Sequence, residues 1–229
     1  MVSLIKDDLR EELEMEKKIV VVVVLVSIGV LMGCSNDENA EEKPIEAKGI
    51  EKVEMKNRVV SYRGKYLELA GNMEELEESS PIIVTVTKGP EDKSITKESK
   101  DSDIPTEFYT MSEVKVNSIE KDETGILKEN NLIKILEDSV ENVSVDGEKY
   151  DLTIDGYKNM KEGEEYTLFI RKSTSGDNYV LTNAVLSKYP VEKVSDRDLF
   201  LEGDENMGGK VDMKATYKEI YQDVLNEYN

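Results

Sequence analysis

Residues 19–32 form one long apolar run, and this run divides the chain into two parts of different character. The run, IVVVVVLVSIGVLM, has 14 residues, whereas an α-helix needs about 20 residues to span a bilayer. It follows Glu16-Lys17-Lys18 and leads directly into Gly33-Cys34-Ser35. A positive start, a short apolar centre and small final residues are typical of a secretory signal peptide. We therefore expect residues 1–33 to be a signal peptide, with a short transmembrane anchor as the alternative.

The end of the run carries a motif around the single cysteine. Leu31-Met32-Gly33-Cys34 places an apolar residue three positions before the cysteine and a small residue directly before it. This motif resembles the lipobox of bacterial lipoproteins, a family that favours Ala, Ser or Thr where this chain has Met32. The resemblance implies that the Cys34 thiol receives a diacylglycerol and that cleavage makes Cys34 the mature N-terminus. Because two or more acyl chains hold a protein stably at a bilayer, the expected location is the outer, extracytoplasmic face of the cell membrane.

Residues 1–14 do not fit this leader. The segment MVSLIKDDLREELE is acidic where a signal peptide has a positive start. We therefore expect translation to begin at Met15. After the acylated cysteine, residues 34–57 are dense in charged and polar side chains, which predicts a flexible tether.

Short alternating segments predict a mainly β domain over residues 58–191. The expected strands are Ile82–Thr87, Thr106–Ile119, Leu132–Leu136, Val143–Val145, Tyr150–Ile154, Tyr166–Ile170 and Asn178–Val185. Asp146-Gly147 is a strong signal for a two-residue hairpin turn. Residues 89–105 are polar and predict an exposed loop, and a bulge near Ser112-Glu113 would bring the apolar residues of the longest strand to one face. Six or seven short strands with regular turns predict a small antiparallel OB-like barrel or a sandwich.

Two helices complete the expected fold. A short helix is predicted at Asn72–Ser79, because Asn72 and Glu75 have the spacing of a capping box. Residues 192–229 predict a loop followed by a C-terminal amphipathic helix with Asp212 as its N-cap. This helix would dock on the barrel or on a partner.

The region from Tyr62 to Val191 resembles extracytoplasmic lipoproteins of Gram-positive bacteria that have an OB-like barrel and no assigned activity. The similarity is carried by NMEELEESS running into PIIVTVTKG, then MKEGEEYTLFI and LSKYPV. The resemblance implies a closed antiparallel barrel, and it supplies no catalytic residue.

Composition excludes several kinds of chemistry. The chain has no His, which excludes imidazole bases and ligands, and its one Cys cannot form an internal disulfide. The net charge of −20 argues against nucleic acid as a partner, because phosphate backbones require clustered Lys and Arg. We therefore expect a protein, peptide or glycan ligand, a membrane contact through the lipid alone, and no cofactor or metal.

The remaining candidates are acids, serines and tyrosines. The acidic clusters lack the spacing of a calcium loop and predict solvated surface; they are Asp101, Asp103, Asp196, Asp198, Glu202 and Asp204. Ser94, Ser99 and the pair Ser187-Lys188 form no catalytic serine–lysine motif. Six tyrosines could stack on sugars or peptides, although packing in the domain is the expected role; they are Tyr62, Tyr66, Tyr109, Tyr157, Tyr179 and Tyr189. The expected function is thus a non-catalytic binding or interaction module, and the alternative is a cell-envelope hydrolase with two carboxylates in one cleft.

Overall fold

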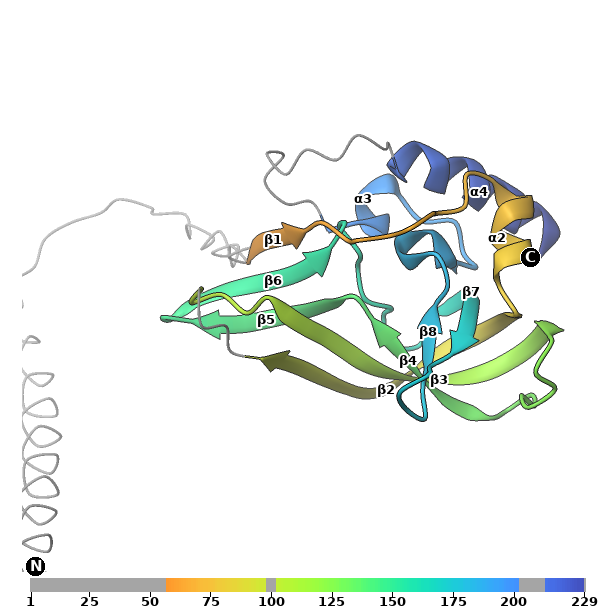
Figure 1. The fold of residues 1–229 in the computed structure, drawn as a ribbon, viewed down its shortest axis with the longest axis horizontal. Helices are drawn as coiled ribbons and strands as arrows, with labels where there is room; N and C mark the ends of the chain where they lie inside the picture. The colour runs from red at the N-terminus through yellow and green to blue at the C-terminus, as the bar shows by residue number, and fades with distance from the viewer. Residues whose placement is uncertain (1–56, 98–101, 202–212, 229) are drawn as a thin grey trace, which may run out of the picture. The chain divides into compact units, whose positions relative to one another are not determined.

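A computed structural model describes residues 57–97, 102–201 and 213–228 (Figure 1). Its larger sheet contains six strands: β2 (Ile82–Lys97), β3 (Glu107–Asp122), β4 (Leu132–Glu137), β7 (Glu165–Lys172), β8 (Tyr179–Leu181) and β9 (Lys188–Pro190). The order is β2-β3-β4-β8-β7-β9, and β7 also pairs with β2, so five strands form a barrel-like ring. Only two residue pairs join β4 to β8, and the ring is therefore partial. The predicted mainly β fold with one short helix and a C-terminal helix is confirmed.

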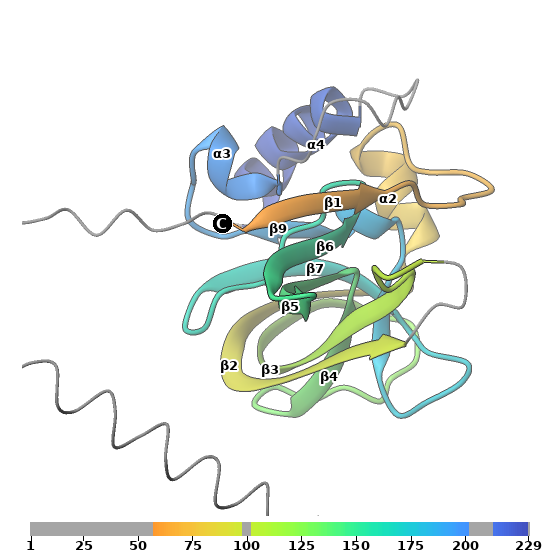
Figure 2. The same ribbon diagram turned by 90° about the vertical axis from the view of Figure 1, so that its left-hand side faces the viewer.

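A second sheet has three strands, two of which lie between β4 and β7 in the sequence. It contains β5 (Ser139–Val145), β6 (Glu148–Ile154) and β1 (Arg58–Tyr62), which runs parallel to β6 (Figure 2). Asp146 and Gly147 connect β5 to β6 with φ angles of 50° and 83°. Two consecutive positive φ angles are typical of a type I′ turn, which confirms the hairpin predicted from this dipeptide.

The long hairpin of β2 and β3 differs from the sequence expectation in two ways. Residues 89–97 belong to β2 and do not form the start of a loop. Opposite Ser112-Glu113 the extra residues lie in β2, because Lys88 pairs with Val114 and Asp92 pairs with Ser112, and two further register shifts lie nearer the start of β2. The buried face of β3 therefore runs without interruption from Phe108 to Val116 and includes the polar Thr110 and Ser112. Hydrogen bonds explain their burial: the Thr110 hydroxyl, for example, donates to the Ser139 carbonyl over 2.6 Å.

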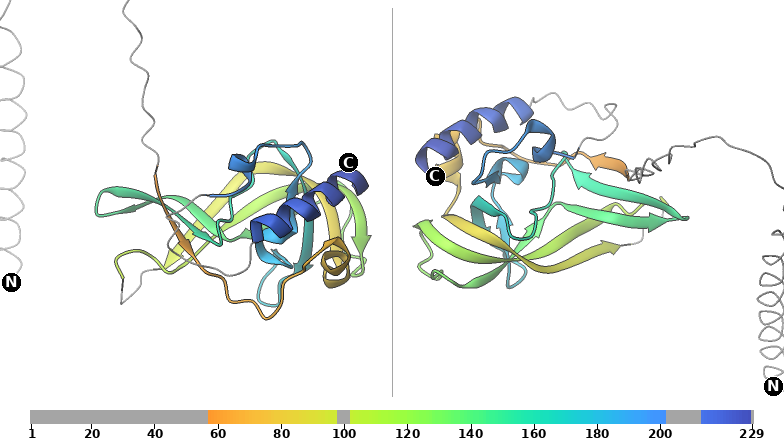
Figure 3. Two further views of the ribbon diagram at one scale, coloured as in Figure 1. Left: turned by 90° about the horizontal axis from the view of Figure 1, so that it is seen from above. Right: turned by 180° about the vertical axis from the view of Figure 1, so that it is seen from behind.

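The helices cover one side of the ring (Figure 3). The short helix α2 (Met73–Ser79) begins as predicted, with the Asn72 side chain accepting a hydrogen bond from the Glu75 amide. The C-terminal helix α4 (Met213–Glu227) docks on its own domain, where Tyr217 stacks on Tyr189 of β9 at 4.7 Å between ring centroids. Two shorter helices, η1 (Ala184–Ser187) and α3 (Asp196–Leu199), lie in the connections. Asp212, the expected N-cap of α4, lies outside the described residues.

Three apolar cores follow from this arrangement. The first fills the ring with residues such as Val84, Ile135 and Leu168, and the second lies between the ring and the helices. The third joins the smaller sheet to the far end of the β2–β3 hairpin through Phe108 and Leu152. In the described ranges no helix is long and apolar enough to cross a membrane.

Candidate functional site

The residues of the predicted lipid site are not among those that the structure describes. Leu31, Met32, Gly33 and Cys34 all precede residue 57. Lipidation of Cys34 therefore stays a prediction from the sequence.

Glu137 is the centre of a buried polar network where the ring meets the smaller sheet. As the last residue of β4 it follows Ile133 and Ile135 on the inward face, and its exposed fraction is 0%. The Tyr157 hydroxyl and the Met160 amide each donate to Oε2 of Glu137 over 2.8 Å. The Ser112 hydroxyl lies against the other carboxylate oxygen. A carboxylate with these donors is fixed in place and stabilised by its surroundings.

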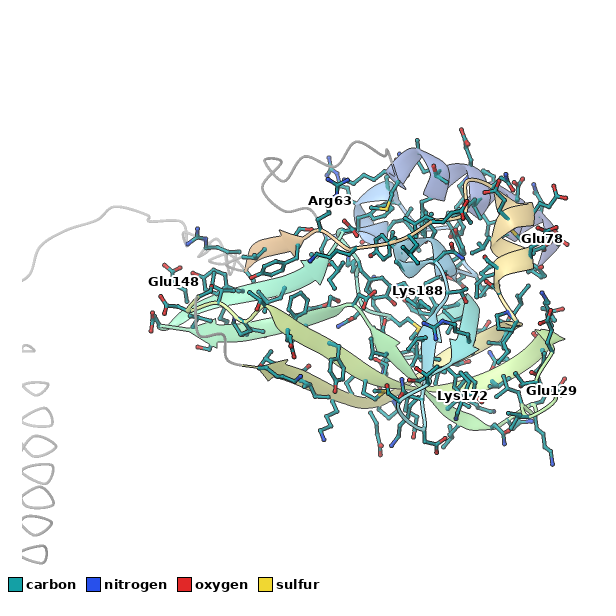
Figure 4. All side chains as sticks on the ribbon, viewed as in Figure 1. Arg63, Glu78, Glu129, Glu148, Lys172 and Lys188 are labelled. Atoms are coloured by element: carbon teal, nitrogen blue, oxygen red, sulfur yellow. The ribbon has the colours of Figure 1, made fainter. Side chains whose placement is uncertain are left out.

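Lys188 of β9 is a buried lysine that is connected to this carboxylate through Tyr157. Its Nζ lies 4.1 Å from the centroid of the Tyr157 ring, whose hydroxyl binds Glu137, and it donates to the Lys158 carbonyl. Burial lowers the pKa of the Lys188 ammonium group to about 8, and the charge of Glu137 opposes this shift. Figure 4 shows Lys188 deep within the molecule, whereas Glu129 and Glu148 lie at the periphery.

The network extends through the irregular part of β2. Lys88 Nζ lies 2.9 Å from Oδ1 of Asp92, and the Ser112 hydroxyl lies 2.7 Å from the same oxygen. A hydroxyl has one proton, so Ser112 donates to either Asp92 or Glu137 at any moment. The result is a line of contacts from Lys88 through Asp92, Ser112, Glu137 and Tyr157 to Lys188.

The space beside Lys188 is too small for a substrate. The cavity measures about 20 Å³, and its lining includes Tyr166, Tyr217 and Lys158. A volume of this size holds about one water molecule. Ser187, the neighbour of Lys188, accepts a hydrogen bond from the Asn183 amide over 2.6 Å and so serves the local turn. The network is therefore suited to holding the two sheets together, and not to receiving a ligand.

A second group of acids lies at the start of the smaller sheet. Burial raises the pKa of Asp138 to about 6, and the charges of Asp155 and Glu137 add to the effect. The carboxylate of Asp155 accepts a hydrogen bond from the Gly64 amide over 3.0 Å. Hollows of 370 to 560 Å³ beside α2 and α4 are lined by neither Asp138 nor Asp155. Asp138 thus has the raised pKa that a carboxylate enzyme needs, but these hollows do not bring it and Asp155 into one cleft.

This raised pKa gives a testable pH dependence. Because the folded state binds the Asp138 proton more tightly than the unfolded state does, the free energy of unfolding falls as the pH rises from about 4 to about 6. We expect Asp138→Asn to raise the free energy of unfolding at pH 7 by about 1–3 kcal/mol and to leave it nearly unchanged at pH 4. Urea unfolding at both pH values measures this difference. Asp146→Asn, in the exposed turn, is the control, and equal effects of the two variants would contradict the prediction.

Several of the candidate acids and tyrosines have structural roles in the described domain. Among the described residues, no group of three or more Asp, Glu, Cys or His side chains could hold a metal ion. Asp196 pairs with Lys218, and Asp198 accepts from the Ser195 hydroxyl; Asp101, Glu202 and Asp204 lie outside the described ranges. Of the six tyrosines, three are buried in the domain: Tyr157, Tyr179 and Tyr189.

The outer surface of β3, β4 and β8 is the part of the ring opposite the helices. Pairing aligns one row of side chains across it: Lys93, Met111, Leu136, Val180 and Arg171. We call this row, together with Leu132 and Lys134 on the same face of β4, the bare face. Leu132 is 63% exposed, and none of the apolar residues of the bare face belongs to the three cores. Sequence patterns missed this surface, because it forms only when distant strands align.

The sequence pattern of β4 could have identified Glu137 as a buried acid. Glu137 follows Ile133 and Ile135 at the two-residue spacing of side chains that share one face of a strand. No alternation of buried and exposed residues marks Lys188 in the same way, because its neighbours are buried as well: residues 183–190 are all buried. Comparison with known proteins adds no further residue: no protein-family model matches the chain, and no curated protein matches it.

Proposed function

We propose that this chain is an exported lipoprotein, anchored by a lipid on Cys34 to the outer face of the cell membrane. The observation that carries the proposal is the position of the single cysteine, directly after a 14-residue apolar run and within Leu31-Met32-Gly33-Cys34. The absence of any other Cys in the sequence supports a dedicated role for this thiol. Lipid anchoring would then leave the acidic domain outside the membrane, since its charge is repelled by anionic head groups.

The domain itself is proposed to be a non-catalytic binding module for a protein, peptide or glycan. The bare face supports this role, because it combines apolar side chains with Lys and Arg on a surface that the domain's own helices leave uncovered. Partly open barrels of the OB kind bind ligands on the face of their second and third strands, which here correspond to β3 and β4. This correspondence is an analogy of fold and not of residues. A net charge of −20 disfavours nucleic acid as the ligand.

The burial and hydrogen bonds of Glu137 favour a binding module over a hydrolase. A catalytic carboxylate must reach substrate, whereas Glu137 is fully buried and is bonded to Tyr157, Met160 and Ser112. Asp138 and Asp155 are the pair that a hydrolase would use. If the purified protein degraded cell-envelope polymer and Asp138→Asn abolished that activity, the non-catalytic assignment would be wrong.

Replacing Cys34 tests the anchor directly. In cells fed radioactive palmitate, we expect the wild-type protein to be labelled and Cys34→Ser to take up no label, because a hydroxyl is not the acceptor of the diacylglycerol. The variant should also keep its signal peptide, which mass spectrometry of the intact protein detects. Ser35→Ala leaves the thiol in place and is the control. An unlabelled wild-type protein would overturn the proposal.

A further inference from the structure

Two surfaces on opposite sides of the domain are complementary in charge. In Figure 2, α2 and α4 lie on one side of the ring and β3 and β4 lie on the other. The bare face runs over β3, β4 and β8, with Lys93 of β2 at one end and Arg171 of β7 at the other. Cross-strand neighbours lie about 4.8 Å apart, so the row from Lys93 to Arg171 extends over about 19 Å, with an apolar centre and a cation at each end. Lys134 adds a third cation beside Leu136.

The cations of the bare face are available to a partner. Within the described ranges, no carboxylate lies within 4.0 Å of the charged nitrogens of Lys93, Lys134 or Arg171. Asp177 interacts with Lys134 through its charge, but its carboxylate is bound to Lys172 over 2.6 Å. The three side chains are exposed, and they are therefore solvated charges in a strongly acidic protein.

The opposite surface has the reverse pattern. A shallow hollow of about 560 Å³ lies between α2 and α4, with the buried Met73 at its floor. Carboxylates surround this apolar floor: Glu74 and Glu77 from α2, and Asp223 and Glu227 from α4. We call this hollow the acidic groove. It complements the bare face mainly in charge, since Met73 is its one apolar lining residue and the carboxylates carry the sign opposite to that of Lys93, Lys134 and Arg171.

We propose that the bare face of one copy of this chain docks on the acidic groove of a second copy. The contact joins two different surfaces on opposite sides of the domain, so each added copy leaves one of each surface free. Contacts of this kind build rings or open rows and not closed two-fold dimers. The proposal deepens the binding role proposed above by naming its partner, and lipid anchoring would favour it by raising the local concentration of copies.

The chemistry of the bare face fits a protein surface better than a membrane or a polyanion. Met111, Leu136 and Val180 are half-buried, so Leu132 is the one strongly exposed apolar side chain of the bare face, which offers little apolar surface for insertion into hydrocarbon. Glu113 pairs with Lys134 across the strands and interrupts the cations that a polyanion would require. The repulsion between two acidic bodies is screened beyond about 8 Å at physiological ionic strength, whereas close pairs across a docked surface persist.

Exchange of charges between the two surfaces tests the contact. Variant one carries Lys93→Glu and Lys134→Glu, and variant two carries Glu74→Lys and Asp223→Lys, all at exposed positions. Full-length copies bearing two different epitope tags are co-expressed and purified through one tag, and the second tag is quantified. We expect self-association of either variant to fall about tenfold or more, because each then presents like charges to itself. Variant one mixed with variant two should recover the wild-type level, since the exchanged charges are again opposite.

Several results would overturn the proposal. Undiminished self-association of either variant, or no recovery in the mixture, rules out this contact. Lys65→Glu with Lys149→Glu is the matched control, because it makes the same change of net charge on exposed residues elsewhere. If variant one instead lost binding to anionic vesicles while its self-association was unchanged, the bare face would be a membrane surface. Palmitate labelling is scored in the same cells, so that a failed anchor and a failed contact are told apart.

Discussion

Replacing Glu137 with Ala is expected to lower the free energy of unfolding by about 3–5 kcal/mol. The change removes the acceptor of the Tyr157 hydroxyl, the Met160 amide and the Ser112 hydroxyl, all of them in the interior. It also leaves the buried ammonium of Lys188 without the carboxylate that offsets its loss of hydration. Removing one partner from a buried charged network costs this much because the remaining groups cannot reach water.

Two further variants separate shape from charge at this position. Glu137→Gln keeps the size of the side chain and loses its charge, so we expect a smaller loss of about 1–3 kcal/mol. Glu129→Ala, at an exposed position in the connection between β3 and β4, is the control and should change the free energy of unfolding by less than about 0.5 kcal/mol. Chemical denaturation monitored by Tyr fluorescence or circular dichroism gives all three values. A loss below about 1 kcal/mol for Glu137→Ala would show that the network does not stabilise the domain.

Tyr217→Ala is the second substitution with a large expected effect. Tyr217 is buried in α4, and its ring lies 4.7 Å from that of Tyr189 and 5.0 Å from that of Phe200. Truncating a buried aromatic residue leaves a cavity and costs about 3–5 kcal/mol. Because these contacts hold α4 on the ring, we also expect the helix to be released and its amides to exchange hydrogen quickly.

The hydroxyl of Tyr217 can be tested apart from its ring. It donates to the Lys188 carbonyl over 2.7 Å, so Tyr217→Phe should cost only about 1 kcal/mol. Gln222→Ala, on the exposed side of α4, is the control. Equal losses for the Phe and Ala variants would mean that the hydrogen bond, and not ring packing, holds the helix.

Local rules predicted the parts of the fold that depend on neighbouring residues. Asp146-Gly147 specified its turn because few dipeptides accept two positive φ angles, and Asn72 specified the start of α2 because its side chain reaches the Glu75 amide. The spacing of Tyr217, Ile220, Tyr221 and Val224 placed α4 in the same way, and all four are buried.

Features that depend on distant residues were not predictable in this way. β1 was not anticipated, since its five residues are fixed by parallel pairing with β6, about 90 positions later in the chain. The expected strand Asn178–Val185 ends at Leu181, because the chain then turns and the Asn183 side chain accepts a hydrogen bond from the Ala70 amide. The irregularity of β2 follows the same logic: Asp92 pairs with Ser112, 20 positions later in the chain, and this pairing places its carboxylate beside the Ser112 hydroxyl.

The closure of the ring has a consequence for the rate at which this chain reaches its native state. Ile82–Thr87 pairs with residues 165–170, so more than seventy residues must be in place before the last edge is joined. Chains dominated by contacts of such long sequence separation fold in milliseconds to seconds, far more slowly than helical bundles. A polypeptide that must cross a membrane before it folds would benefit from this delay, because the chain stays unfolded, and able to pass through a translocation channel, for longer.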